Sequence, residues 1–442
     1  MVGAQSSEIY GILLGDPLVS ERFSDAAHLR ALLDVEAALA RAQGKLGIIP
    51  ADAAAAIDEA AQGLTIAPAG LVGPTCGAGL PVIALVETLR DAVGGEAAQY
   101  VHWGATSQDI LDTGLVLQLR TVLQSLSGRL DTVIAWLALL ARSHRDTIMV
   151  GRTRSQQATP ITFGLKAVNW LAPLIRHRER LAQLRPRVLV VQLGGAAGTM
   201  AAYGDERPEL ITAFADELSL GAPMAPWHAG RDGFAELASW FSLTTGSLGK
   251  VGQDLVLLSQ SEVGEVGFDG GGGSSTMPQK QNPVLAETLV TLARHTVGLL
   301  GTAHLALVHG HERDGAAWAS EWLTLPQMAV ATATSLAHAV TIFDMLTVDS
   351  ARMMANLEAS NGAVLAEAAS FALSEHMPRA EAYALVKQAA GESANTGVHL
   401  IEVLKSKSDA PVDWAAVADP KNWTGAAGAL VDRICAEADG DA

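Results

Sequence analysis

A glycine-rich stretch, Gly270–Pro283, brings hydroxyl, amino and amide side chains together in a short space. It reads GGGGSSTMPQKQNP, so four glycines precede Ser274 and Ser275, and Lys280 and Asn282 follow. Glycine restricts φ and ψ little, so ordering this loop costs entropy, and mobile loops on a rigid scaffold often act as lids. A serine that exchanges a proton, a lysine that holds an anion and an amide suit such a lid. A linker between two helices is the alternative, because glycine-rich stretches commonly have that role.

A second group of small polar residues, GATSQD over Gly104–Asp109, comes directly before a long helical pattern. Thr106, Ser107 or Asp109 could cap that helix, which is the commoner role of these residue types. The free N–H groups and the hydroxyls at a helix N-terminus can also bind an anion. The residues by themselves leave both roles open.

Arginines are concentrated in the segment before Pro160. Arg152 and Arg154 flank a threonine there, and Gln156 follows. An arginine cluster usually faces solvent, but the same side chains can clamp a carboxylate through paired N–H donors.

A histidine pair lies later in the chain, at His309 and His311. No third ligand follows it at helical spacing, so no metal is expected. Arg313, next to the pair, is better suited to steady a closed loop or a substrate anion.

The composition restricts the class of protein. The chain has 442 residues, a net charge of −17 and a pI near 5.1, which argues against a nucleic-acid partner. A polyanionic small molecule could therefore bind only where cations are gathered locally. Cys76 and Cys435 lie far apart, which suits a reducing cytoplasm. Neither a signal peptide nor a membrane-spanning segment is expected, so the predicted location is cytoplasmic.

Helical periodicity dominates the chain and predicts an all-α fold. Apolar residues recur at a mean spacing near 3.6 from Leu115 to beyond Leu137, which predicts a helix on the order of 50 Å long. Four more long helices are predicted at Thr159–Leu184, Phe234–Val263, Pro283–Leu307 and Ser320–Leu346. The first of these should begin with Thr159 as a cap and Pro160 at the first helical position. Five such helices predict an elongated central bundle.

Three domains are expected on this basis. They are an N-terminal helical domain over 1–110, the five-helix bundle over 111–347 with the glycine loop at 264–283, and a C-terminal helical domain over 348–442. In the first domain, Ser24 should cap a helix over Asp25–Leu46, and Thr65–Pro81 should form a loop.

The stretch Gly273–Pro283 resembles the signature loop of the fumarase/aspartase superfamily, Gly-Ser-Ser-x-Met-Pro-x-Lys-x-Asn-Pro. The resemblance implies the three-domain fold of that superfamily and a catalytic base at Ser274, which takes a proton from a carbon next to a carboxylate. Lys280 could help Ser274 by favouring its alkoxide. Gly-x-Thr-Ser-x-Asp is another signature of the superfamily, which implies that Thr106 and Ser107 bind a substrate carboxylate. The superfamily forms tetramers around a twenty-helix core, so a homotetramer with active sites shared between subunits is expected.

One signature position departs from the superfamily. The superfamily usually has Arg-Thr-His-x-Gln-x-Ala-x-Pro here, and its histidine acts as a general acid or as part of a proton relay. This chain has Arg154 in place of that histidine. Arginine does not titrate near neutral pH and cannot fill that role. A leaving amine or hydroxide needs protonation, whereas a carboxylate does not, so this chain suits the addition or expulsion of a carboxylate. Gln156 keeps the substrate-binding amide, which favours an anion clamp formed with Arg152 and Arg154.

The chain also resembles one branch of the superfamily, the bacterial 3-carboxy-cis,cis-muconate cycloisomerases, over most of its length. This resemblance implies a cofactor-free enzyme of aromatic catabolism (the β-ketoadipate pathway) that closes a 3-substituted muconate to a lactone. The matching residues include Phe23–Asp25, Tyr100–Asp109, Thr113–Arg120, Gly194-Gly195, Trp227-His228, Arg231-Asp232, His311–Arg313 and Glu321-Trp322. Ser274 and Lys280 are the expected catalytic residues, and the expected substrate-binding residues are His102, Thr106, Ser107, Arg152, Arg154, Gln156, Ser275, Asn282 and Arg313.

The loop differs from this branch at two positions. The branch tends to read Met-Pro-His-Lys-Arg-Asn-Pro, and this chain has Gln279 and Gln281 around Lys280. Together with Arg154, this pattern indicates cations redistributed within one anion pocket, so 3-sulfomuconate is an alternative substrate. A lyase acting on adenylosuccinate or argininosuccinate is a further alternative, which Arg154 disfavours. An inactive helical scaffold is the last, which the retained Ser274 disfavours.

Overall fold

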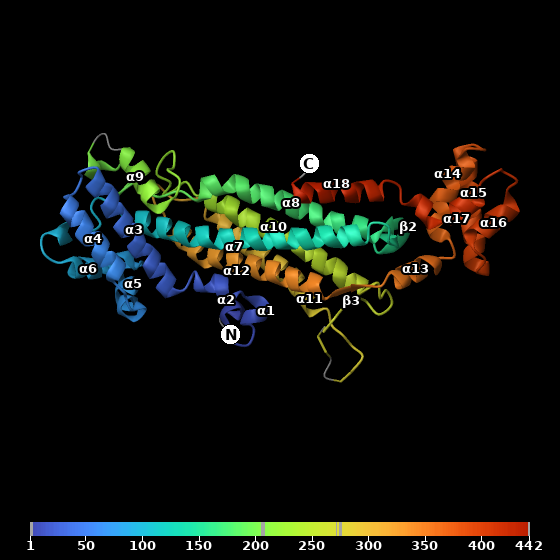
Figure 1. The fold of residues 1–442 in the computed structure, drawn as a ribbon, viewed down its shortest axis with the longest axis horizontal. Helices are drawn as coiled ribbons and strands as arrows, with labels where there is room; N and C mark the ends of the chain where they lie inside the picture. The colour runs from blue at the N-terminus through green and yellow to red at the C-terminus, as the bar shows by residue number, and fades with distance from the viewer. Residues whose placement is uncertain (1–2, 205–207, 271, 274–275, 441–442) are drawn as a thin grey trace. The chain divides into compact units, whose positions relative to one another are not determined.

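The computed structural model describes residues 3–204, 208–270, 272–273 and 276–440 (Figure 1). The contacts between residues divide the chain into two compact units. Unit 1 consists of Met1–Arg129, His177–Gly246 and Thr291–Ala337, and unit 2 consists of Leu130–Arg176, Ser247–Val290 and His338–Ala442. The division into three domains along the sequence stays a prediction.

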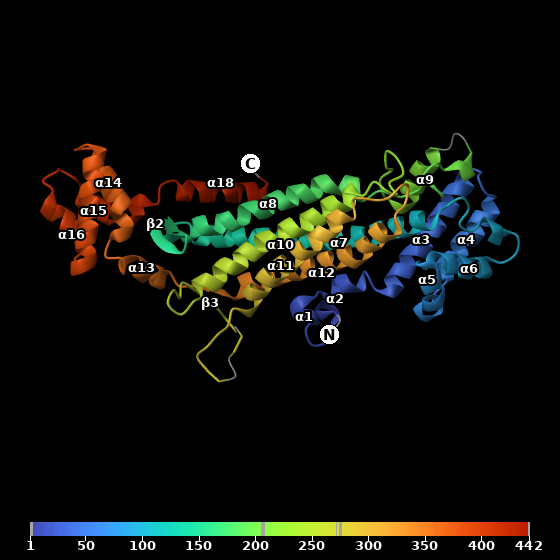
Figure 2. The same ribbon diagram turned by 180° about the vertical axis from the view of Figure 1, so that it is seen from behind.

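Five long helices each contribute a segment to both units (Figure 2). They are α7 (Ser107–Ser143), α8 (Phe163–Val188), α10 (Asp232–Leu258), α11 (Val284–Leu305) and α12 (Gly315–Met345). The predicted all-α class with long central helices is therefore confirmed. By length and composition α12 could cross a membrane, but 72% of its most apolar window is buried inside the fold, as in the core helix of a soluble protein.

The predicted helix start at Thr159-Pro160 is wrong. Strand β2 (Gln156–Thr162) covers these residues and pairs antiparallel with β1 (Ile148–Thr153). Helix α8 starts only at Phe163, and Thr162 Oγ1 accepts a hydrogen bond from the Leu165 N–H (3.1 Å) in the manner of a cap. The Thr-Pro signal was misleading because proline is also tolerated in short two-stranded sheets, where its missing N–H can face away from the ladder.

The helices of unit 1 outside the long five pack around buried leucine, alanine and phenylalanine side chains. Ser24 caps α3 as predicted, its Oγ accepting from the Ala27 N–H (3.3 Å), and Gly47 follows the helix end with φ of +64°. The expected loop at Thr65–Pro81 contains a short helix, so that prediction is only partly correct. The elements are η1 (Ala4–Ser6), α1 (Gly11–Leu14), α2 (Pro17–Glu21), α3 (Asp25–Lys45), α4 (Ala51–Gly63), η2 (Pro68–Leu71), α5 (Val72–Ala78), α6 (Val82–Val93), η3 (Ala97–Tyr100), η4 (Ala201–Tyr203) and α9 (Glu209–Leu218).

Unit 2 contains the β1–β2 hairpin, a second two-stranded sheet and the C-terminal helices. Ile148 and Val150 of β1 lie in one core with Leu365 and Leu404, so the hairpin is anchored by the C-terminal helices. Strand β3 (Val266–Phe268) pairs antiparallel with β4 (Leu346–Val348) and leads directly into the glycine loop. The remaining elements are α13 (Ser350–Glu358), η5 (Ala363–Leu365), α14 (Ala366–Ser374), α15 (Arg379–Thr396), α16 (Leu400–Lys407), α17 (Trp414–Ala418), η6 (Pro420–Trp423) and α18 (Ala427–Asp439).

Candidate active site

One buried carboxylate fixes the start of α7 in unit 1. Asp109 is 0% exposed, and its Oδ1 accepts hydrogen bonds from the Gly194 N–H (2.9 Å) and from Nε2 of His228 (2.7 Å). Its Oδ2 accepts from the N–H groups of Gly195 (2.9 Å) and Thr106 (3.0 Å). These charge-assisted bonds hold three chain segments together. Asp109 is thus committed to structure, and it leaves the predicted Thr-Ser pair at the helix N-terminus, where N–H groups and hydroxyls can bind an anion.

Glycine is needed on two sides of this carboxylate. Gly104 has φ of +73°, and a Cβ there would lie 2.4 Å from Cε1 of Tyr203. A Cβ at Gly194 would lie 2.8 Å from Cε1 of His228. Neither distance is tolerated between real atoms, so larger residues would push the surrounding segments away from Asp109.

Arg313 lies beside the same helix start. Its Nε donates to Oε1 of Gln108 (2.8 Å), and its Nη2 donates to the carbonyl oxygen of Ala196 (3.3 Å). Gln108 Nε2 in turn donates to the carbonyl oxygen of His228 (3.0 Å). The structure therefore brings Arg313 into one network with the predicted anion site in unit 1.

A buried ion network supports this region from further along α7. The Arg231 guanidinium donates to both oxygens of Asp112 (2.6 and 3.1 Å), and its Nε donates to Oε1 of Glu321 (2.9 Å). Trp318 Nε1 donates to Asp112 as well (2.9 Å), and the guanidinium stacks 4.7 Å from the ring centroid of Trp227. Burial raises the pKa of Glu321 even though Arg231 opposes it. Removing one member would leave a buried charge unpaired at a cost of about 3–5 kcal/mol.

His102, another predicted substrate-binding residue, is also in unit 1. Its Nδ1 lies 2.6 Å from Oε1 of Glu36, whose side chain is only 1% exposed. The backbone of His102 has φ of +62°, which is uncommon for a residue with a Cβ.

The His309–His311 pair lies in the connection between α11 and α12. Both ring nitrogens of His309 are buried and lack a hydrogen-bond partner within the described residues. Burial, followed by the charge of Arg231, lowers the pKa of this imidazole. Among the residues that the structure describes, no group of three or more histidine, cysteine or acidic side chains is arranged to hold a metal.

In unit 2, Arg152 is held by a buried carboxylate. Its Nη1 and Nη2 donate to the two oxygens of Glu265 (2.8 and 2.6 Å), and Asn356 Nδ2 donates to the same carboxylate (2.9 Å). Glu265 is 0% exposed and immediately precedes β3. This bidentate pair ties the β1–β2 hairpin to the base of the glycine loop. Arg152 is therefore already paired with Glu265, whether or not it also binds a substrate anion.

Arg154 and Gln156 lie at the tip of the same hairpin. Arg154 and Ser155 form the turn with φ of +49° and +64°, as in the type I′ turns that suit the twist of paired strands. Gln156 pairs with Thr153 at the first position of β2. The Arg154 and Gln156 side chains are exposed, so they are accessible to a ligand or a partner.

The predicted catalytic loop joins β3 to α11 and appears yellow in Figure 1. Ser274 and Ser275 lie outside the described residues. Lys280 is exposed, and the Asn282 backbone forms a bridge with Gly272 through hydrogen bonds of 2.7 and 3.2 Å. A Cβ at Gly272 would lie 2.5 Å from Cγ2 of Val284, so this bridge requires glycine.

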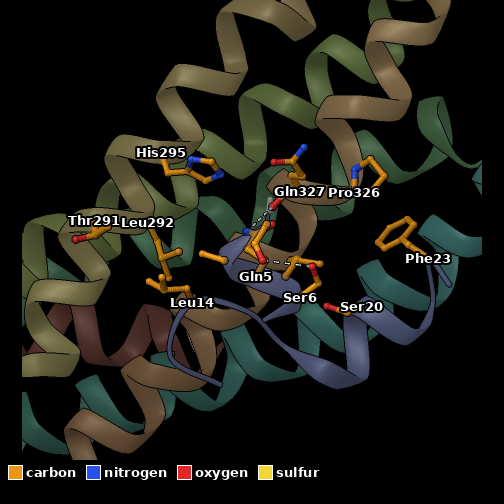
Figure 3. A pocket seen from close by; sticks show the side chains of 13 residues that line it. Gln5, Ser6, Leu14, Ser20, Phe23, Thr291, Leu292, His295, Pro326 and Gln327 are labelled. Carbon is orange, nitrogen blue, oxygen red and sulfur yellow. Dashed lines mark hydrogen bonds between the residues drawn. The ribbon is translucent and has the colours of Figure 1, made fainter. Parts of the chain in front are cut away.

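A cavity of about 580 Å³ lies elsewhere in unit 1 (Figure 3). The N-terminal segment lines it together with residues of α11 and α12, and Gln5 Nε2 donates to the carbonyl oxygen of Gln327 (3.2 Å). His295 is the titratable group of this lining, so the cavity lacks the several cations that a polyanion needs. None of the predicted site residues lines it.

Three acidic residues hold predicted site residues in the two units, and none of them was predicted in that role. Glu36 and Glu265 each hold a predicted binding residue, and Asp109 was considered only as a cap. Glu36 lies among alanines and leucines in the middle of α3, and a charged residue inside so apolar a segment was the available signal. Glu265 gave no comparable signal, because its partners are far away in the sequence.

Both units are mainly helical, and each contains a cluster of the predicted site residues. The sequence profile of the family described as "Lyase" matches residues 16–298, and that of "Adenylosuccinate lyase C-terminus" matches residues 362–434. The chain belongs to this lyase family, which confirms the predicted resemblance to the fumarase/aspartase superfamily.

Individual relatives are similar over nearly the whole chain. A 3-carboxy-cis,cis-muconate cycloisomerase from Pseudomonas aeruginosa is 43% identical, with 94% of this chain and 93% of the relative covered. The crystal structure of the 3-carboxy-cis,cis-muconate lactonizing enzyme from Pseudomonas putida has a TM-score of 0.91 at 39% identity and covers 98% of this chain and 100% of its own. A nitrosuccinate lyase from Streptomyces davaonensis is 39% identical, with coverage of 94% and 91%.

Proposed function

We propose that this protein is a 3-carboxy-cis,cis-muconate cycloisomerase of aromatic catabolism. The observation that carries the proposal is the near full-length similarity to enzymes of that name, at up to 43% identity. This chain has Arg154 where the superfamily usually has a histidine that acts as a general acid. The proposed reaction does not need that acid, because a carboxylate adds or leaves without being protonated.

The proposed reaction needs no cofactor. One carboxylate oxygen of the substrate forms a bond to an alkene carbon, and the π electrons of that alkene take up a proton at the neighbouring carbon. The Ser274 hydroxyl donates this proton, Lys280 stabilises the alkoxide that remains, and the alkoxide regains a proton from water. Because the nucleophile is tethered to the alkene, proximity supplies much of the rate.

The predicted catalytic and substrate-binding residues that the structure describes divide between the units of the chain. His102, Thr106, Ser107 and Arg313 belong to unit 1, while Arg152, Arg154, Gln156, Lys280 and Asn282 belong to unit 2. We propose that a cytoplasmic homotetramer assembles complete sites from more than one subunit. Sedimentation would test this assembly, together with a gain of activity on mixing a His102 variant with a Lys280 variant, each impaired on its own.

Two other substrates deserve comparison because of particular residues. Arg154, with Gln279 and Gln281, favours 3-sulfomuconate as the second candidate, since a guanidinium binds a sulfonate as readily as a carboxylate. Nitrosuccinate is the third, because a nitrosuccinate lyase is also 39% identical.

The deciding experiment measures kcat/KM for all three substrates and identifies each product. The proposal expects lactone from 3-carboxy-cis,cis-muconate with the largest kcat/KM. The S274A variant should lose about 10²- to 10⁴-fold in kcat, the usual contribution of a positioned proton-transfer group. A larger kcat/KM on either other substrate would replace this proposal with the corresponding candidate.

A further inference from the structure

His102 combines an uncommon backbone conformation with a short side-chain contact to Glu36. His102 has left-handed backbone (φ of +62°), and such a conformation persists only where the surroundings hold it. One support is the 2.6 Å contact between Nδ1 and Oε1 of Glu36. The side chain of His102 is 16% exposed and that of Glu36 only 1%, so the carboxylate is inside the fold and the imidazole is at its edge.

Groups from four elements surround this imidazole. Glu36 comes from α3, Asp109 from α7 and Arg90 from α6, and Tyr203 of η4 lies close to both carboxylates. The hydrogen-bonding capacity of Asp109 is taken up by four N–H donors from other residues, and Glu36 is the carboxylate in direct contact with the imidazole. A buried carboxylate without a cation would be costly, so this position favours a protonated partner.

The charges around His102 agree with this geometry. Burial alone would lower the pKa of His102, but the charge of Glu36 and the hydrogen bond to it outweigh burial and raise the pKa above its ordinary value. The imidazolium is therefore present below this raised pKa and is lost only as the pH rises through it.

We propose that Glu36 is a positioning residue that keeps His102 as a fixed imidazolium beside the start of α7, where it binds a carboxylate of the substrate. This inference rests on the proposed function for the identity of that substrate. With Nδ1–H donated to Glu36, the imidazolium still has Nε2–H as a second donor. A chain with net charge −17 needs such local cations to hold a tri-acid.

The first test needs no substrate. In the full-length protein labelled with ¹³C-histidine, the ring of His102 is assigned by comparison with H102N and titrated by NMR. The expected result is a pKa above the ordinary value of about 6.5 in the wild type and below it in E36Q, where Asp109 alone opposes burial and the charge of Arg90. E217Q is the matched control, because Glu217 pairs with Arg41 and Lys45, is not among the charges that act on His102, and should leave the His102 titration unchanged. A wild-type pKa at or below the ordinary value would overturn the inference.

The second test measures KM and kcat for 3-carboxy-cis,cis-muconate between pH 5.5 and 8.5. At pH values between the His102 pKa of E36Q and that of the wild type, only the wild type carries the imidazolium. In this range KM should be about tenfold higher for E36Q than for the wild type, as expected for the loss of one charge-assisted contact. The increase should nearly vanish at the acidic end, where both proteins carry the imidazolium, and kcat should change less than KM. E36Q/H102N should be no worse than H102N, because Glu36 acts through the imidazole.

A pH-independent loss in E36Q, or a double variant much worse than H102N, would assign Glu36 a merely structural role. If the wild type fails to convert this substrate, the proposed function fails, while the NMR titration still decides whether Glu36 holds the imidazolium.

Discussion

Replacing Asp109 with asparagine tests how strongly one carboxylate holds the predicted anion site. D109N keeps the shape but turns one acceptor oxygen into an NH₂ donor. If the NH₂ faces Gly195 and Thr106, two backbone N–H groups lose their acceptor. If it faces Gly194 and His228, the imidazole can change tautomer and accept, so only one N–H is orphaned. The second orientation should therefore be adopted.

The hydrogen bonds set the size of the effect. One orphaned buried N–H costs about 1–3 kcal/mol, and bonds to a charged acceptor exceed neutral ones by about 1 kcal/mol each, partly offset because no charge is buried any longer. We expect D109N to lower the free energy of unfolding by about 2–4 kcal/mol. KM should rise only modestly, because the remaining oxygen still accepts from the Thr106 N–H but no longer belongs to a charged group.

The loss of unfolding free energy is measured by urea unfolding, followed by tryptophan fluorescence. All proteins are compared at one fixed concentration, because the stability of an oligomer depends on concentration. D349N is the matched control. Asp349 caps α13 by accepting from the Arg352 N–H (2.8 Å), and asparagine caps equally well, so its effect should be below about 0.5 kcal/mol. A loss in D109N no larger than in D349N would refute the four-donor account.

Three further predictions follow from the structure. E265Q leaves the two N–H donors of the Arg152 guanidinium with one acceptor oxygen. The variant should lower the free energy of unfolding by about 2–4 kcal/mol in urea and should also lower kcat in steady-state kinetics. G104A places a Cβ against Tyr203 in left-handed backbone and should lower the free energy of unfolding by about 2–5 kcal/mol in the same assay. G128A is the control and should cause no such loss, because a Cβ there meets nothing within 4 Å. R154W should change the ratio of kcat/KM between 3-sulfomuconate and 3-carboxymuconate, and an unchanged ratio would remove Arg154 from the substrate site.

The long helices were predictable because their signal is local and repeated. Apolar spacing located all five, with most boundaries correct to within about five residues, as expected for frayed or capped ends. The β1–β2 hairpin was missed because its determinants are different. A turn with positive φ at Arg154 and Ser155 has no glycine to announce it, and the packing of Ile148 depends on helices about 200 residues later.

The candidate site was predictable only in part, for a related reason. Thr106, Ser107 and Arg313 have recognisable sequence settings. The structure links Thr106 and Arg313 in one network through Asp109, His228 and Gln108. Their supporting acids could not be paired from sequence, since Glu265 contacts Arg152 across more than a hundred residues. Pairings of this kind follow from the tertiary fold, which neither periodicity nor capping rules specify.

The most direct test of the central claim follows the proton. The wild-type protein is incubated with 3-carboxy-cis,cis-muconate in D₂O, and the product is analysed by NMR. The account predicts a lactone carrying one deuterium on the carbon next to the new C–O bond, formed at least about 100-fold more slowly by S274A. Substrate recovered unchanged with the wild type, or lactone formed equally fast by S274A, would contradict it.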